Sequence, residues 1–193
     1  MSSEKNSGKL EVITGCMFAG KTEELLKRLR RAEISGQEVE IFTPEIDDRY
    51  EREKIQSHNG NGWEAQVVTT DEEGIETISK SEADVLAIDE FNFFNKSFIE
   101  TVQQKADEGK KVILSGLDQD FKAEAFSPMD TALAVADDVV KLSAVCEGCG
   151  ADATRTQRII DGEPAHEDDP QVVVGSDEKY EARCRNCHTV RRG

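Results

Sequence analysis

The sequence predicts an α/β fold, in which helices cover both faces of a parallel sheet, followed by a small C-terminal domain. Two observations predict the sheet. Short apolar runs alternate with helical stretches up to Leu142, and the run 85–88 is apolar at every position, as in a strand buried on both faces. The third observation is a change of pattern, since from Cys146 onward Gly, Asp and Arg surround two cysteine pairs and no helix is evident. We therefore expect two domains, residues 1–143 and 144–193.

The α/β part begins as a strand, a glycine-rich turn and a helix. The helix is indicated by apolar residues at helical spacing from Leu25 to Ala32, before a natural stop at Gly36. Pro44–Trp63 is polar and rich in Gly and Asn, so we expect a loop there. The full set of expected elements is strands at 10–14, 39–43, 66–69, 85–88, 111–115 and 139–142, with helices at 21–35, 71–80, 97–108 and 128–136.

Composition limits the classes of partner. The chain of 193 residues is 37% apolar, enough for a core, and it contains no run of roughly 18 apolar residues that could cross a membrane. Its net charge of −16 disfavours a nucleic-acid partner, because such proteins need basic patches. The acidic clusters are spread along the chain, which fits a solvated surface or adaptation to high salt. A polar N-terminus without an apolar core segment favours a cytoplasmic location.

A phosphate-binding motif lies between the first strand and the first helix. Residues 15–22 match G-x-x-x-x-G-K-[ST], whose glycines let backbone N–H groups converge on phosphate oxygens. Lys21 would reach the β- and γ-phosphates of a nucleotide, and Thr22 would offer its hydroxyl to Mg²⁺. An ordinary glycine-containing turn is the alternative. The expected phosphate-binding residues are Gly15, Cys16, Met17, Phe18, Ala19, Gly20, Lys21 and Thr22.

Two acidic residues follow the buried strand 85–88. Asp89 is placed to hold the water shell of Mg²⁺, although a turn aspartate would also stand there. Glu90 can be the base that takes a proton from an attacking hydroxyl or, in an ATPase, from water. The alternative is an ordinary surface glutamate.

The cysteine pairs Cys146-x-x-Cys149 and Cys184-x-x-Cys187 suit tetrahedral Zn²⁺. Their 34-residue spacer exceeds the usual spacer of about 15 to 20 residues, which indicates a zinc ribbon with a long inserted loop. The alternatives are disulfides, a thioredoxin-type motif and a haem attachment site. The last of these arises because Cys184–His188 also matches the C-x-x-C-H motif. Cys16 reads as a packing residue rather than a ligand.

Taken in order, these motifs resemble those of the cytosolic thymidine kinase family over nearly the whole chain. The segments that carry the resemblance are the phosphate loop with Met17-Phe18, Ile88–Phe94, Gly116-Leu117-Asp118, Val139–Cys146, Arg155–Arg158 and Gly175–Tyr180. The family often has Gly-Gln after its Asp-Glu pair, where this chain has Phe91-Asn92.

The resemblance implies a RecA-like core that carries ATP, and a zinc ribbon whose long loop closes over thymidine as a lasso. It implies Glu90 as catalytic base, Asp89 as the Mg²⁺ carboxylate and Arg49 as a phosphate contact. The residues it places around thymidine are Met17, Phe93, Leu117, Phe121, Thr156, Val173, Gly175 and Tyr180. It further implies a homotetramer, feedback inhibition by thymidine triphosphate, and activity on thymidine and deoxyuridine in nucleoside salvage.

Two other functions remain open from the residues alone. One is a RecA-type ATPase whose zinc ribbon docks a partner, and the other is a zinc-ribbon adaptor that binds nucleotide as a regulatory ligand. Neither of these two functions explains the lasso residues near Thr156 and Tyr180. Because the phosphate loop belongs to the first domain, we expect loss of zinc to abolish thymidine binding and to leave ATP binding largely intact.

Overall fold

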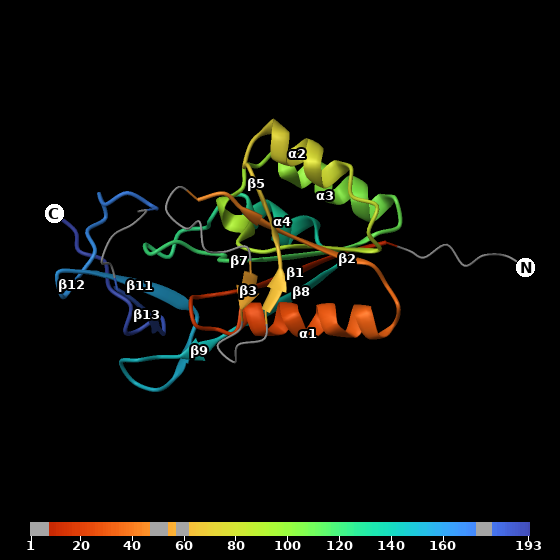
Figure 1. Cartoon of the computed structure of the whole chain (residues 1–193). Coiled ribbons are helices and arrows are strands. Elements are labelled where there is room, and N and C mark those ends of the chain that lie inside the picture. Colours follow the sequence, from red (N-terminus) through yellow and green to blue (C-terminus); the bar gives the residue numbers. More distant parts are fainter. Residues whose placement is uncertain (1–7, 47–53, 57–61, 173–178) are drawn as a thin grey trace, which may run out of the picture.

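Six strands form the central sheet, in the order β5-β2-β6-β7-β1-β8 (Figure 1). The computed structural model describes residues 8–46, 54–56, 62–172 and 179–193. The strands of the sheet are β1 (Lys9–Gly15), β2 (Val39–Pro44), β5 (Gln66–Val68), β6 (Val85–Ile88), β7 (Lys111–Gly116) and β8 (Asp138–Leu142). Every pairing in the sheet is parallel, which confirms the expected fold class.

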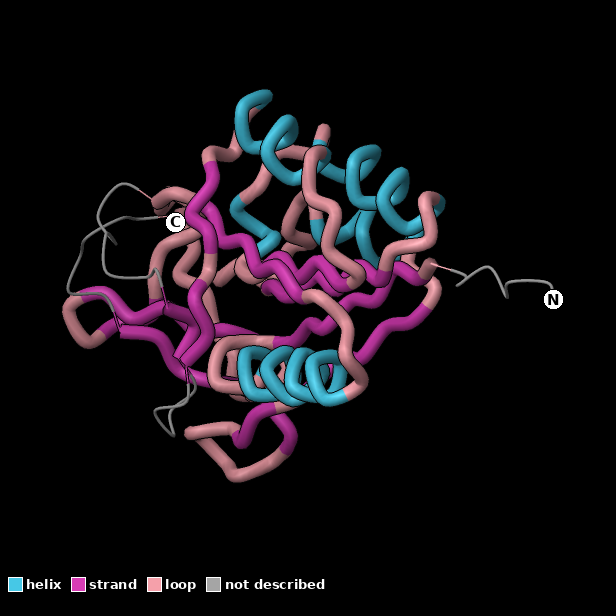
Figure 2. The backbone as a smooth tube through the Cα atoms, turned by 45° about the vertical axis from the view of Figure 1, so that its right-hand side comes forward, coloured by secondary structure: helices cyan, strands magenta, loops and turns pink. Residues whose placement is uncertain are grey.

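Helices cover both faces of this sheet. The helix α1 (Lys21–Ile34) packs on one face, while α2 (Glu72–Ser79), α3 (Phe98–Asp107) and α4 (Met129–Val135) cover the other (Figures 1 and 2). Within the residues that the structure describes, no helix is both long enough and apolar enough to span a bilayer.

The strand β6 shows why both faces are apolar. Leu86 and Ile88 pack into the core beneath α2, α3 and α4, whereas Val85 and Ala87 pack into the core beneath α1. All four side chains are fully buried. Because successive side chains of a strand point to opposite faces, a strand covered on both sides must be apolar throughout. This burial fixes where β6 ends, and Asp89 follows directly.

Two features depart from the sequence-based prediction. We expected a loop at Pro44–Trp63, but β3 (Lys54–Gln56) lies within this segment and pairs antiparallel with β4 (Gly62–Glu64), which overlaps its end. Ile55 and Trp63 are residue types that favour strands, but the prediction gave more weight to the polar composition of the segment. The second feature is a short 3₁₀-helix, η1 (Phe91–Phe93), which has no periodic signal of its own.

The C-terminal module, residues 144–193, is built from short strands without a helix among its described residues. These strands are β9 (Ala144–Val145), β10 (Asp152–Ala153), β11 (Arg155–Ile160), β12 (Glu163–Pro164) and β13 (Lys179–Arg183). β9 pairs with β10, and β11 lies between β12 and β13. The module lies beyond the carboxyl end of the sheet (Figure 1). Its division from residues 1–143 as a separate domain stays a prediction.

A buried carboxylate ties β1 to its neighbours on the α1 face. The Glu11 side chain is 7% exposed and contacts Arg28 at 2.6 Å, Lys111 at 3.1 Å and Lys9 at 3.2 Å. Burial opposes ionisation of Glu11, but Lys111 and the other cations outweigh it and lower its pKa below the ordinary value. The ionised form is therefore the one that stabilises the fold.

Glu11→Gln should lower the free energy of unfolding by about 1–3 kcal/mol at pH 7, because Arg28 and Lys111 lose their buried counterion. The folded pKa of Glu11 is lower than the unfolded one, so its contribution is present above the ordinary value of 4.5 and is lost as pH falls through the folded pKa. Urea unfolding at pH 7 and pH 4 should show the difference between parent and variant shrinking at the lower pH. The exposed Glu76→Gln serves as control, and an equal effect of both variants would contradict this role of Glu11.

Candidate functional site

The phosphate loop, the acidic pair and the turn after β7 meet at the carboxyl end of the sheet. Ile88 of β6 pairs with Leu114 of β7, and Gly116 of β7 pairs with Thr14 of β1. Because parallel strands leave the sheet at the same edge, the segments that follow β1, β6 and β7 are brought together there. The sheet thus gathers three motifs that lie far apart in the sequence.

A cavity of about 230 Å³ opens between these segments and the C-terminal module. A single buried water needs only about 10–15 Å³, so the cavity has room for a small organic molecule. The residues that line it are Met17, Phe18, Lys21, Thr22, Ile46, Asp89, Glu90, Asn92, Phe93, Gly116, Leu117, Gln119, Asp120, Phe121, Phe126, Thr156, Gln171, Val172 and Tyr180.

Most of the residues expected from the sequence lie on this wall. Lys21, Thr22, Asp89 and Glu90 line one part of it, and the expected thymidine contacts that line it are Met17, Phe93, Leu117, Phe121, Thr156 and Tyr180. Gly15, Cys16, Ala19 and Gly20 belong to the loop but not to the lining. Three expected residues, Arg49, Val173 and Gly175, lie outside the described residues.

The phosphate loop adopts a conformation that glycine permits. Gly15 has φ +139°, and a Cβ there would collide with the carbonyl oxygen of Leu142 on β8. Gly20 precedes α1 with φ +82°. Phe18 holds φ +66° without being glycine, and its side chain is 59% exposed. Positive φ at a bulky residue costs of order 1–3 kcal/mol, and such strain clusters at ligand sites. The loop is shaped for close approach of a ligand to its backbone.

Lys21 begins α1 and folds back over the loop. Its Nζ donates a hydrogen bond to the carbonyl oxygen of Cys16 at 2.8 Å. Burial lowers the pKa of Lys21, although nearby carboxylates such as Asp89 oppose the shift. A partly buried ammonium beside a helix N-terminus is a strong site for phosphate oxygens.

The acidic pair is held in an unusual backbone turn. Glu90 has φ +50°, in the left-handed region, and its N–H donates to Oδ1 of Asp89 at 2.9 Å. Burial, together with the negative charge of Glu90, raises the pKa of Asp89 to about 6. Two carboxylates that crowd each other in this way are relieved by a cation, so the pair is suited to a divalent metal ion.

The structure shows how the fold accommodates Phe91 and Asn92, which stand where the family often has Gly-Gln. Phe91 is fully buried and stacks on Phe94 at 5.7 Å, so its ring belongs to the core rather than to the cavity. Asn92 accepts a hydrogen bond from the N–H of Leu117 at 2.9 Å. A Cβ at Gly116 would lie 2.8 Å from Asn92 Oδ1, which explains the glycine there. The Phe91 side chain is therefore not part of the cavity wall that Glu90 lines.

Several cavity residues were not anticipated. The segment 119–120 follows β7, and its position after a strand end was an available signal. Asp120 is 3% exposed and accepts a hydrogen bond from Nε2 of Gln171 at 3.0 Å. Gln171 and Val172 come from the long segment between the cysteine pairs, where no sequence pattern indicates which residues reach the cavity. Phe126 packs edge-on against Phe93 at 6.2 Å.

The module also reaches the aromatic wall of the cavity. Arg158 is 1% exposed, and its guanidinium lies 5.0 Å from the centre of the Phe121 ring. The ring nitrogen Nε2 of His188 lies 2.8 Å from the carbonyl oxygen of Phe121. These contacts hold Phe121 between the core and the module.

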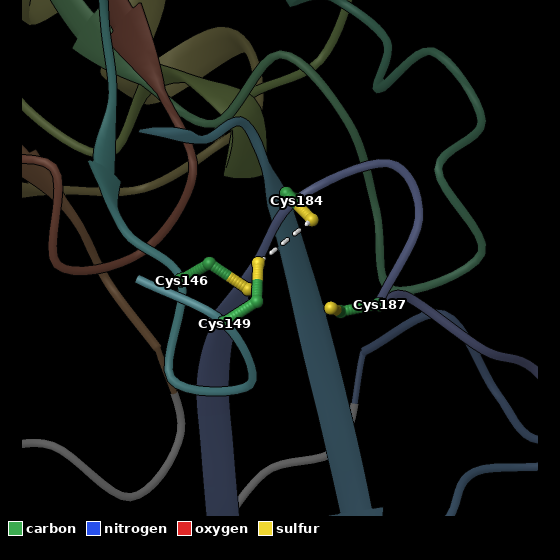
Figure 3. Close-up of side chains that lie close together, drawn as sticks. All are labelled: Cys146, Cys149, Cys184 and Cys187. Carbon is green, nitrogen blue, oxygen red and sulfur yellow. Dashed lines mark hydrogen bonds between the residues drawn. The ribbon is translucent and has the colours of Figure 1, made fainter. Parts of the chain in front are cut away.

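The four paired cysteines form one cluster (Figure 3). Their Sγ atoms all lie within 4.8 Å of one another, and Cys149 Sγ lies 3.7 Å from Cys184 Sγ. Zinc held tetrahedrally by sulfurs at about 2.3 Å would separate them by about 3.8 Å. The cysteines Cys146, Cys149, Cys184 and Cys187 can therefore hold a metal ion, and their geometry is consistent with zinc.

The electrostatics of the cluster favour a bound cation. Backbone N–H groups, first that of Cys184, lower the pKa of the Cys146 thiol to about 6. The sulfurs of Cys149, Cys184 and Cys146 raise the pKa of Cys187 to about 12. The neighbouring sulfurs thus disfavour a thiolate at Cys187, and a bound dication would remove that penalty.

Comparison with known proteins decides the family. The profile of the family described as thymidine kinase matches residues 8–188. The chain belongs to the thymidine kinase family. A thymidine kinase of Halobacterium salinarum is 53% identical over 194 residues, covering all of both chains. A thymidine kinase of Haloquadratum walsbyi is 44% identical over 223 residues, covering 99% of each chain.

One solved structure is a more distant match. It is that of a DNA replication initiation factor, with 16% identity, a TM-score of 0.44, and coverage of 71% of this chain and 41% of that chain.

Zinc binding can be tested at the exposed ligand Cys149. The purified chain should contain one zinc ion per molecule, and Cys149→Ser should lose most of it and unfold at a lower temperature. Cys149 is exposed, so the loss would come from the metal rather than from packing. Elemental analysis and thermal unfolding measure the two effects. Cys16→Ser, outside the four-sulfur cluster, should keep its zinc, and a zinc-free parent protein would contradict the assignment.

Proposed function

We propose that this chain transfers the γ-phosphoryl group of ATP to the 5′-hydroxyl of thymidine, giving thymidine monophosphate. The observation that carries the proposal is a single cavity that joins the phosphate loop, the acidic pair and the C-terminal module, in a chain of the thymidine kinase family. The relatives named thymidine kinase that cover the whole chain support the same reaction.

The nucleotide occupies the phosphate-loop side of the cavity. Residues Gly15 to Thr22 surround the phosphates, and Lys21 exchanges its bond to the Cys16 carbonyl for phosphate oxygens. Arg49, which lies outside the described residues, contributes a further cation to the transferring oxygens.

The nucleoside occupies the opposite side, which is lined largely by apolar and aromatic groups. Met17, Phe93, Leu117, Phe121 and Tyr180 enclose the base, because flat rings are held by apolar faces and a few fixed polar groups. Val173 and Gly175 read its edges through their backbone groups. Deoxyuridine lacks only the methyl group of thymidine and should also be accepted.

The residues around the acidic pair fit Mg²⁺ bound with ATP. Mg²⁺ prefers oxygen ligands, and Thr22 and Asp89 bring a hydroxyl and a carboxylate to the same wall of the cavity. When bound, the ion neutralises charge on the β- and γ-phosphate oxygens. The raised pKa of Asp89 supports this fit, since the carboxylate gains most from a nearby cation.

Glu90 serves as the general base. Its side chain lines the cavity beside Asp89, where the carboxylate takes the proton of the 5′-hydroxyl as its oxygen attacks the γ-phosphorus. The bond between that phosphorus and the β,γ-bridging oxygen breaks, and ADP leaves. Lys21 and Arg49 stabilise the charge of the transferring oxygens, and the module residues that line the cavity shield it from water that would compete as acceptor.

The remaining parts of the proposal concern the cell and the assembly. The zinc ion is structural, the enzyme acts in nucleoside salvage in the cytoplasm, and it is a homotetramer inhibited by thymidine triphosphate. The resemblance to thymidine kinases supports these statements.

A nucleoside panel tests the reaction directly. With ATP and Mg²⁺, the chain should phosphorylate thymidine and deoxyuridine and should act little on purine nucleosides. Equal rates with every acceptor would contradict the proposal. Turnover of ATP without any nucleoside would favour the ATPase alternative.

Glu90→Gln should lower kcat by about 10² to 10⁴, because the amide keeps the size of the side chain but cannot accept a proton. The affinity for thymidine should change little. Steady-state kinetics at saturating ATP and thymidine measure both values. Glu100→Gln, on the exposed side of α3, is the control. A kcat within a few-fold of the parent would mean that another group is the base.

A further inference from the structure

Cys16 connects the phosphate loop to the C-terminal module. Its side chain is 2% exposed, and its Sγ donates a hydrogen bond to the carbonyl oxygen of Ala153 at 3.3 Å. The backbone carbonyl of the same residue accepts the hydrogen bond from Lys21. One residue thus contacts the module through its side chain and the phosphate-binding lysine through its backbone.

Cys16 is also part of the small apolar core of the module. It packs in one buried cluster whose other members are Ala144, Cys146, Ala153, Ala182 and Cys184. Two of these are among the four clustered cysteines. A side chain of the phosphate loop therefore belongs to the same packed unit as the metal-binding sulfurs.

A second contact joins the loop to the module. The N–H of Met17 donates a hydrogen bond to Oγ1 of Thr156 at 3.1 Å. Thr156 is 3% exposed and pairs with Ala182 on β13, two residues before Cys184. The second cysteine pair thus lies next to the contact between Met17 and Thr156.

The first pair is connected to the loop in the same way. Ala153 of β10 pairs with Ala144 of β9, and Cys146 follows β9 directly. The N–H of Cys146 donates to the carbonyl oxygen of Ala151 at 2.8 Å, which closes the hairpin around the knuckle. Loss of the metal would release the hairpin that presents Ala153 to Cys16.

We propose that Cys16 is a positioning residue, through which the C-terminal module holds the phosphate loop in its nucleotide-binding shape, so that zinc and nucleotide bind cooperatively. The proposal rests on the proposed function only in that the loop binds nucleotide. It reverses the expectation that loss of zinc spares ATP binding, because that expectation treated the loop as independent of the module.

Thermodynamic linkage makes the proposal quantitative. If zinc raises the affinity for ADP by some factor, ADP must raise the affinity for zinc by the same factor. Couplings between two sites in one protein are typically about 5- to 150-fold. The loop and the module are joined by two hydrogen bonds and one buried side chain. We therefore expect each ligand to raise the affinity for the other by about 5-fold or more.

The test measures both sides of this linkage. The affinity for ADP is determined by titration calorimetry with zinc-loaded and zinc-free protein, and the affinity for zinc by competition with a chelator, with and without saturating ADP. The competition starts from the loaded protein, so it does not require the zinc-free chain to be purified first. We expect the two factors to agree.

Two variants assign the coupling to Cys16. Cys16→Ala removes the thiol donor and should reduce the coupling factor toward one, while zinc remains stoichiometric. Cys16→Ser keeps a donor that can reach the Ala153 carbonyl and should retain most of the coupling. A role in packing alone would give the opposite order, because serine buries a hydroxyl where alanine leaves an apolar surface.

The outcomes separate this proposal from the proposed function. ADP affinity that is equal with and without zinc, in a protein that phosphorylates thymidine, would overturn the coupling and leave the function standing. Zinc-loaded protein that binds no ADP would overturn both. Full coupling in both Cys16 variants would show that Cys16 is not the positioning residue.

Discussion

The parallel hydrogen-bond register of β6, β7 and β1 is the constraint on which the rest of the structure depends. It sets Ile88 beside Leu114 and Gly116 beside Thr14, so the phosphate loop, the acidic pair and the β7 turn leave the sheet at one edge. The apolar faces of these strands hold the register, because a shift of one strand by one residue would turn its side chains to the opposite face of the sheet. Chemistry at the edge is therefore positioned by hydrocarbon packing within the sheet.

The electrostatics of that edge suit a charged ligand. Burial and the charge of Glu90 disfavour ionisation of Asp89, and burial disfavours the charge of Lys21. A charged group that loses hydration is costly unless a group of opposite charge lies beside it. In the proposed function, a triphosphate with its metal ion supplies the opposite charge for both the carboxylates and the ammonium. This pattern of charge fits a complex of anion and cation better than it fits either alone.

Much of the fold was predictable because its signals are local. The phosphate loop is a fixed spacing in sequence, the buried strand 85–88 is a continuous apolar run, and the cysteine pairs imply their own geometry. What could not be predicted depends on distant partners. The contact of Gln171 with Asp120 joins residues 51 positions apart, and no periodicity marks either of them. The β3–β4 pair was missed because two strand-forming side chains are diluted by polar neighbours.

The place of β1 in the sheet has a consequence for synthesis of the chain. β1 lies between β7 and β8, and the loop that follows it also contacts Ala153 and Thr156. A ribosome adds about 5–20 residues per second, so these partners emerge on the order of 10 s after the loop itself. Contacts that span most of a chain form late. The phosphate loop is thus translated well before Ala153 and Thr156, and it cannot make these contacts until both residues have been synthesised.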